Sequence, residues 1–383
     1  MTTRVPVNPR LLHWAWERAR LDPDTLVKRF PQLEEWETGE RQPTLKQLED
    51  FAKATLTPFG YFFLPEPPEE TLPIPDFRTV ASRAVRRPSA QLLETLNICI
   101  RRQEWYREHA LAEEQAPLAF IGGSRIADGV EAVAAAIRAV VRLDPDARRT
   151  AKDGDAALRA MFEQVEEAGI LVMRNGVVGN NTSQPLSVEE FRGFALSDPH
   201  APLVFINAAD TKAAQMFTLA HELAHLWLGE SGISNSEETL APSGAATEAF
   251  CNRVAAEALV PMRDFRAVWN ENADPVAEFR RLATRFRVST LVIIRRAHDA
   301  GFLSAESFNI AYKDELDRIM RFARGSGGDF YKTQTSRLGR RFPRALLEST
   351  LGGATLYRDA FRLLGISKTE TFEKLARELR FAI

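Results

Sequence analysis

The chain has 383 residues, with 45% hydrophobic residues, 27% charged residues and a formal net charge of −2, which is ordinary for a soluble globular protein. Two cysteines, Cys99 and Cys251, exclude a disulfide framework and favour a reducing compartment. The N-terminal stretch MTTRVPVNPR has no apolar core of a signal peptide, and no apolar run is long enough to cross a membrane. We therefore expect a cytoplasmic protein of two or three domains.

Residues 1–64 are predicted to form a module of short helices. Pro9–Arg20 carries an apolar stripe, Asp24 is a candidate N-cap for a second helix ending near Phe30, and Thr44–Lys53 is a further helix. The string EEWETGERQPTLKQLEDFAKA resembles the second half of an XRE-type (Cro/repressor-like) helix-turn-helix, which implies a DNA-binding fold.

The N-terminal module departs from that pattern where a recognition helix would lie. Phe30 runs almost directly into Gln32–Trp36, and the shortened segment carries Glu34 and Glu35, which repel phosphates. The first 55 residues contain nine basic and nine acidic residues, so a basic footprint is lacking. We read the module as helix-turn-helix-like, with DNA a possible but doubtful partner.

Residues 65–80 are rich in Pro and acidic residues and are interpreted as an extended linker that packs on its neighbours. The region 81–150 is predicted to be helical, with helices over Ser89–Leu111 and Val130–Val141. An amphipathic helix over Asp155–Ala168 then opens the next predicted domain, 151–262. Strand-like segments follow at Gly169–Met173, Phe191–Ser197 and Pro202–Asn207.

The stretch His221-Glu222-Leu223-Ala224-His225 is an H-E-x-x-H motif within a predicted helix that stops at Gly229. Two His four residues apart lie on one helix face, so both imidazoles can reach one Zn²⁺ ion. Glu222 is placed to activate water as a general base. The alternative is two core histidines on a buried helix, which would need buried partners.

A zinc site of this kind needs a third protein ligand, and the string after His225 lacks the third His of the metzincin pattern. A downstream Glu must serve, and the candidates are Glu230, Glu237, Glu238, Glu248 and Glu257. Glu230 is too close along the chain, and Glu237 and Glu238 lie in a polar stretch interpreted as a loop.

The predicted helix Thr247–Pro261 carries the other two candidates. Glu248 and Glu257 are nine residues apart, so they point to opposite helix faces and only one can face the metal. Glu248 shares its face with Asn252 and small alanines, which permits close packing on the motif helix. Glu248 is therefore favoured, Glu257 is expected to be solvated, and Asn252 is a candidate to hydrogen-bond a ligating His.

FTLAHELAH followed by EAFCNRVAAEALVP resembles the ImmA/IrrE metallo-endopeptidases, over about Ala156–Met262. The resemblance implies zinc ligands at His221, His225 and Glu248, a general base at Glu222, and a small sheet beside the zinc helices. Cys251 stands where the family usually has Ala. The expected fold class is therefore α+β: a mostly helical chain with a zincin-like core between helical N- and C-terminal regions.

The region 263–383 is predicted to be helical and basic. Residues 262–383 carry 23 Lys and Arg against 15 Asp and Glu, which is compatible with an interdomain contact, a nucleic acid or an acidic partner, or simply a solvated surface. Pro275–Leu303 resembles a second helix-turn-helix, with Ser289 a candidate N-cap; a structural or substrate-binding use is favoured. Gly325–Gly328 is interpreted as a hinge.

The expected chemistry is peptide-bond hydrolysis. The oxyanion-stabilising group is not identified by spacing, and His200, Arg192 and the five Tyr are candidates. His13, His109 and His298 are expected to be surface or packing residues. The segment Arg192–Asn207 is a candidate edge strand for docking an extended peptide.

The resemblance implies a protein substrate: a DNA-binding repressor or an antitoxin-like regulator in the cytoplasm. The alternative is a helix-turn-helix transcription regulator or antitoxin-like binding protein whose zincin domain senses or scaffolds. Metal content and a Glu222→Gln comparison distinguish the two. The oligomeric state is not indicated by the sequence.

Overall fold

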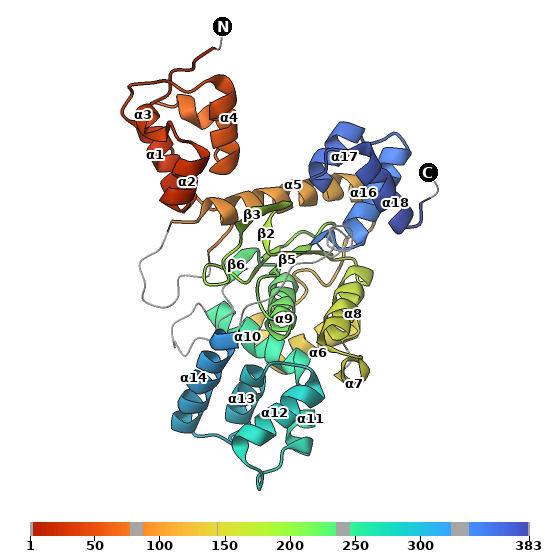
Figure 1. Ribbon diagram of the computed structural model, residues 1–383. Helices are drawn as coiled ribbons and strands as arrows, with labels where there is room; N and C mark the ends of the chain where they lie inside the picture. The colour runs from red at the N-terminus through yellow and green to blue at the C-terminus, as the bar shows by residue number, and fades with distance from the viewer. Residues whose placement is uncertain (1–2, 77–86, 144, 235–245, 323–336, 382–383) are drawn as a thin grey trace.

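The computed structural model describes the chain except for residues 1–2, 77–86, 144, 235–245, 323–336 and 382–383 (Figure 1). A small central sheet lies between groups of helices, with the N- and C-terminal helices towards one end and α11–α14 at the other (Figure 1). The expected α+β, mostly helical class is confirmed. Gly325–Gly328, Glu237 and Glu238 lie outside the described residues. No helix in the described ranges combines the length and apolarity that a membrane crossing needs.

The N-terminal module consists of short helices around one apolar cluster that includes Trp36 and Phe51. The elements are α1 (Pro9–Arg18), α2 (Pro23–Arg29), α3 (Leu33–Glu37), α4 (Leu45–Ala54) and the 3₁₀ helix η1 (Phe59–Phe63). The N-cap predicted at Asp24 is wrong. The cap is Asp22, whose side chain accepts from the Thr25 amide, because Pro23 takes the first helical position.

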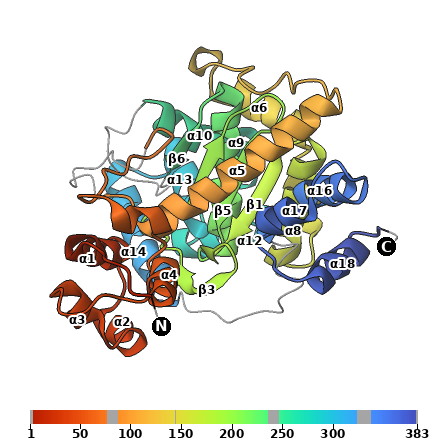
Figure 2. The same ribbon diagram turned by 90° about the horizontal axis from the view of Figure 1, so that it is seen from above.

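Each side of the sheet is covered by helices, and the strands alternate between two apolar clusters. On β5 (Leu203–Asn207), Val204 and Ile206 belong to the cluster with α9 (Lys212–Leu228). Leu203 and Phe205 face the cluster with α5 (Ala90–Ala112) instead. Figure 2 shows α5 crossing over the sheet. This period-two alternation explains why β5 is apolar at consecutive positions.

The sheet has the strand order β1-β5-β4-β6. β1 (Leu171–Asn175) pairs with β5 in parallel, while β4 (Gly193–Leu196) pairs antiparallel with both β5 and β6 (Gly232–Ser234). The sequence-based interpretation of 192–207 as an edge strand is therefore wrong. β4 and β5 are internal strands, and β6 is the edge strand next to β4. A separate hairpin joins β2 (Val177–Val178) and β3 (Asn181–Pro185).

The remaining helices form two groups. Those around the α9 cluster are η3 (Ile126–Asp128), α6 (Val130–Val141), α7 (Pro145–Thr150), α8 (Gly154–Glu167), α10 (Ala246–Leu259), α11 (Met262–Val268), α12 (Pro275–Phe286), α13 (Thr290–Asp299) and α14 (Ala305–Phe322). The predicted Ser289 cap is confirmed, since its side chain accepts from the Val292 amide. Arg296 of α13 is buried among these helices, so its positive charge does not contribute to a basic surface.

The C-terminal helices pack on α5 and on the end of α8. They are α16 (Arg341–Leu351), α17 (Tyr357–Leu364) and α18 (Thr369–Glu378). Buried Glu166 anchors them, because its carboxylate accepts the amide N–H groups of Arg340 and Arg341 at 2.8 and 2.9 Å. Burial raises the pKa of Glu166 to about 7, although these hydrogen bonds lower it in part.

The raised pKa of Glu166 should make stability depend on pH. Between the ordinary pKa of 4.5 and about 7, the folded protein keeps a proton that the unfolded chain has lost. The free energy of unfolding should therefore fall by about 3 kcal/mol as pH rises through this window. We expect Glu166→Gln to remove that part of the pH dependence in urea unfolding at pH 5 and pH 8. An identical pH dependence in both proteins would contradict the assignment.

Candidate metal centre

Helix α9 carries the H-E-x-x-H motif and is defined at both ends. Thr211 caps its start by accepting from the Ala214 amide, and Gly229, at φ 75°, ends it in the left-handed conformation. The amides of Gly122 and Ser124 donate to the carbonyls of Leu226 and Trp227, both at 3.0 Å. Because its last carbonyls are occupied, the end of α9 next to the motif is held in place.

Three side chains converge at the candidate centre: His221 and His225 from α9, and Glu248 from α10. The two Nε2 atoms are 3.1 Å apart. Glu248 Oε1 lies 2.9 Å from His225 Nε2, and Glu248 Oε2 lies 3.3 Å from His221 Nε2. All three residues are buried. Among the described residues, this is the group of three potential ligands that lies close enough to hold one metal ion.

The donor set fits a metal. Burial alone would raise the pKa of Glu248, but the charge and hydrogen bond of His221 and the contacts with His225 lower it to about 2. Contacts with Cys251, Glu230 and Glu248 hold the pKa of His225 well above its usual value despite burial. The pocket thus favours positive charge between these atoms, which a divalent cation supplies. Two imidazoles and one carboxylate suit Zn²⁺.

Glu222 lies beside this group and does not join it. Its Oε1 accepts a hydrogen bond from Ser234 at the end of β6, while Oε2 is buried with no partner among the described residues. Burial raises the pKa of Glu222 to about 6, against the lowering effect of the neighbouring His221 and His225. A buried carboxylate with a raised pKa and one oxygen without a hydrogen-bond partner among the described residues is suited to accept and return a proton near neutral pH.

The structure separates Glu248 from Glu257 as helix phase predicted, but Glu257 is not solvated. It is 7% exposed, forms an ion pair with Arg296 and accepts the Met262 amide at 3.2 Å. The expectation of a solvated Glu257 is therefore wrong. Helix α13 brings the buried guanidinium of Arg296 to Glu257, which the sequence pattern of α10 alone cannot indicate.

Sequence reasoning missed the surroundings of His225. Glu230 was set aside as a ligand, and its Oε2 lies 3.8 Å from Nδ1, the ring nitrogen turned away from Glu248. Cys251, treated as a minor departure from the family pattern, interacts with the His225 side chain, and burial raises the pKa of its thiol. Both residues therefore lie next to the imidazole of His225, a placement that no spacing rule indicates.

The other candidates have different surroundings. Asn252 Oδ1 is buried without a hydrogen-bond partner among the described residues, so its predicted bond to a ligating His is not observed. Arg192 pairs with Asp210, and His200 Nδ1 lies 3.1 Å from the Gln115 carbonyl oxygen. Of the tyrosines, Tyr331 lies outside the described residues, and Tyr61, Tyr106, Tyr312 and Tyr357 make aromatic contacts elsewhere. His13 is exposed, His109 stacks on Trp105, and His298 packs on Phe308, as expected.

Gly193 on β4 makes room for Glu222. A Cβ atom there would lie 2.6 Å from Thr218 Cγ2, 2.8 Å from Glu222 Oε1 and 2.9 Å from the Phe205 carbonyl oxygen. We expect Gly193→Ala to lower the free energy of unfolding by about 1–3 kcal/mol through overpacking, measured by urea denaturation. Gly154→Ala is the matched control, because nothing lies within 4 Å of its added Cβ. Equal stability of the two variants would contradict the close approach at Gly193.

Comparison with family models gave two matches. Residues 165–298 match the model of peptidase family M78, described as an IrrE N-terminal-like domain, and residues 338–378 match a domain of unknown function, DUF8813. The first match contains α9 and α10 and supports the resemblance to the ImmA/IrrE family. It indicates a metallopeptidase-type domain in this part of the chain. Comparisons with curated proteins and with solved structures found no match.

Proposed function

We propose that the chain is a zinc-dependent endopeptidase that cleaves a regulatory protein. The observation that carries this proposal is the buried group of His221, His225 and Glu248. Beside it lies Glu222, whose Oε2 has no hydrogen-bond partner among the described residues. Zinc held by these three side chains would supply Lewis-acid polarisation of the scissile carbonyl and make an attacking water more acidic.

Residues of the chain itself carry out the proton transfer and position the general base. Glu222 accepts the proton of the attacking water and passes it to the leaving amine, and its raised pKa suits both steps. Ser234 holds the carboxylate in place through the hydrogen bond to Oε1. Gly193 on β4 lets the sheet approach Glu222 closely, and all four residues of the site are buried.

The proposed substrate is a helix-turn-helix repressor or an antitoxin-like regulator in the cytoplasm, as the family resemblance implies. In this proposal the N-terminal module is an XRE-like helix-turn-helix fold. A module of this kind is suited to pairing with a similar domain of the regulator. The alternative, a regulator whose zincin domain only senses or scaffolds, has no basic N-terminal footprint to favour it.

Two measurements on the full chain test the proposed function. Elemental analysis should find about one zinc per purified chain. New protein N-termini should then be mapped in cells that express the chain or its Glu222→Gln form. We expect cleavage of at least one DNA-binding regulator only with the unchanged chain. A purified protein without bound metal, or the same set of N-termini in both cultures, would contradict the enzyme.

A further inference from the structure

The outer edge of β6 is already paired with another part of the same chain. The Ile233 amide donates to the Pro75 carbonyl oxygen at 3.1 Å, and Asp76 forms a parallel bridge with Ile233. Pro75 and Asp76 therefore lie beside Ile233, on the side of β6 opposite β4. Extended peptides add to a sheet at its strand edges. A peptide that binds the outer edge of β6 would therefore compete with Pro75 and Asp76.

The edge of β6 leads directly to the candidate metal centre. Ser234, the last residue of the strand, donates its hydroxyl to Glu222, and Glu222 is adjacent to the ligand His221. An extended chain paired with the outer edge of β6 thus runs past the general base. Since β4 and β5 are internal, β6 is the strand beside this centre that a substrate backbone can reach.

The side chains of Thr71–Asp76 alternate in exposure ahead of the contact with β6. Leu72, Ile74 and Asp76 are half-buried, whereas the intervening Thr71, Pro73 and Pro75 are exposed. Leu72 and Ile74 pack on the apolar cluster that includes Ile233 and Phe194. The chain bends at Pro73 and Ile74, so Leu72 and Ile74 hold the segment through side-chain packing, while Pro75 and Asp76 make the backbone contact with β6.

Proline limits the pairing of this segment with β6. Pro75 accepts the hydrogen bond from Ile233, but it has no amide N–H and cannot donate to the strand. A peptide with all its amide groups can form more main-chain hydrogen bonds at the same edge. A substrate peptide can therefore displace Leu72–Asp76, because this segment leaves some hydrogen-bonding groups of the β6 edge unpaired.

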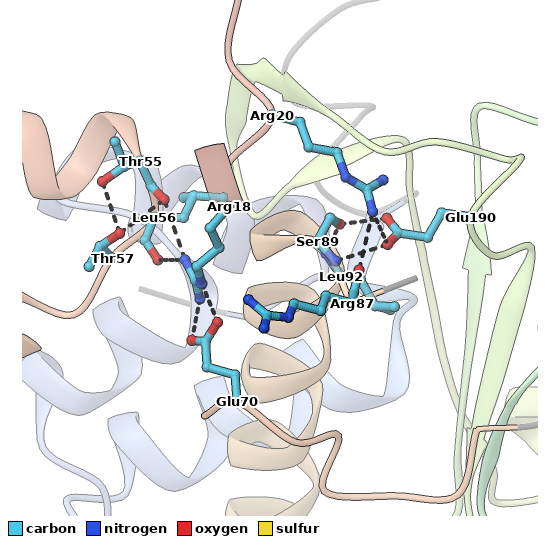
Figure 3. Close-up of polar contacts among 10 residues, drawn as sticks. All are labelled: Arg18, Arg20, Thr55, Leu56, Thr57, Glu70, Arg87, Ser89, Leu92 and Glu190. Carbon is cyan, nitrogen blue, oxygen red and sulfur yellow. Dashed lines mark hydrogen bonds and ion pairs between the residues drawn. The ribbon is translucent and has the colours of Figure 1, made fainter. Parts of the chain in front are cut away.

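The other end of the linker is fastened to the N-terminal module. Arg18 of α1 forms a two-pronged ion pair with Glu70, with Nη2 at 2.7 Å from Oε1, and also donates to the carbonyl oxygens of Thr55 and Leu56 (Figure 3). Its side chain is only 8% exposed. Glu70 and the β6 contact at Asp76 are six residues apart, so movement of the module is transmitted to the edge over at most about 20 Å of chain.

A second contact ties the module to the core beside this linker. Glu190 accepts hydrogen bonds from the amide and hydroxyl of Ser89 at the start of α5, and it forms an ion pair with Arg20 at 3.5 Å (Figure 3). Arg20 also donates to the Arg87 carbonyl oxygen. A partner that binds and shifts the N-terminal module would strain both contacts together.

We propose that Leu72–Asp76 is an intramolecular occupant of the peptide-docking edge of β6, held there by the N-terminal module through Arg18 and Glu70. This inference rests on the proposed peptidase function and adds its regulation. Substrate must displace the linker before its backbone can pair beside the metal centre, and displacement of the module by a protein partner opens the edge.

Ile74→Asp tests the occupant, with Thr71→Asp as the matched control at an exposed position of the same linker. Both are made in the full chain carrying Glu222→Gln, so that binding is measured without cleavage. The probe is fluorescein-labelled β-casein, an unfolded protein, and the readout is fluorescence anisotropy. If the linker covers the edge in about 90% of molecules, its release should tighten casein binding about tenfold, with no change for Thr71→Asp.

Hydrogen exchange at the Ile233 amide provides a readout that does not depend on zinc or hydrolysis. This amide should be protected in the unchanged chain and in Thr71→Asp, and it should exchange faster in Ile74→Asp. Ile74→Ser is a milder second variant should the charged one fail to fold. Rapid exchange of Ile233 in the unchanged chain, or equal casein binding by both variants, overturns the inference. Failure of the peptidase proposal would show separately, as absence of cleavage by the chain with Glu222 intact.

Discussion

Replacing Glu222 by Gln should lower peptide-bond cleavage by about 10²- to 10⁴-fold while zinc content stays unchanged. The amide keeps the shape of the side chain, and its oxygen can still accept the hydrogen bond from Ser234, so the fold is preserved. The amide cannot accept the proton of an attacking water. The measurement is the cleavage rate of a mapped substrate, with zinc determined on the same sample.

The Glu222→Gln variant distinguishes a role of Glu222 as general base from a role as zinc ligand. Loss of zinc along with activity would show that Glu222 is needed for the metal and would assign it a different role. Full activity with zinc bound would remove Glu222 from the proposed mechanism. A circular dichroism melting curve of each protein serves as the control for folding.

Replacing Glu248 by Gln should weaken zinc binding by at least about 100-fold, because a direct ligand contributes more than the outer partners whose loss costs about 10- to 100-fold. Glu248 bridges both imidazoles at 2.9 and 3.3 Å, and Gln offers one neutral oxygen in place of the carboxylate. Competition with a chromogenic zinc chelator at pH 7.5 measures the change.

Glu257→Gln is the matched control, since it makes the same change on the same helix away from the site. It should leave zinc binding unaltered. It should lower the free energy of unfolding by about 3 kcal/mol, because buried Arg296 loses the nearer of its two carboxylate partners, Glu257 and Asp299. Zinc loss in Glu257→Gln but not in Glu248→Gln would reverse the ligand assignment made from helix phase.

Much of the local structure follows from short-range patterns in the chain. Helices at Ala90–Ala112, Val130–Val141 and Lys212–Leu228 were expected within a few residues, because apolar periodicity, N-cap side chains and Gly229 act locally. The shared face of His221 and His225 also follows from helix phase, since a helix fixes which of its side chains share a face, whereas the approach of Glu248 depends on the packing of α10 on α9.

Expectations that depended on neighbours elsewhere in the chain were less successful. The strand at Gly193–Leu196 was interpreted as an edge, but the short strand Gly232–Ser234, too brief to show a pattern, pairs with its open side. Glu257 was expected to be solvated, but Arg296, 39 residues later, pairs with it in the interior. Asp24 was placed as an N-cap, although Asp22 has the position before Pro23.

The sequence by itself therefore determined the main helices, the strands β1, β4 and β5, and the two histidines that share a helix face, because those depend on backbone preferences and on side-chain spacing along one element. Only the tertiary structure decided that Ser234 holds Glu222, that Cys251 and Glu230 flank His225, and that Pro75 lies on the edge of β6. These contacts join segments far apart in the chain, and they exist only after the core has brought the elements together.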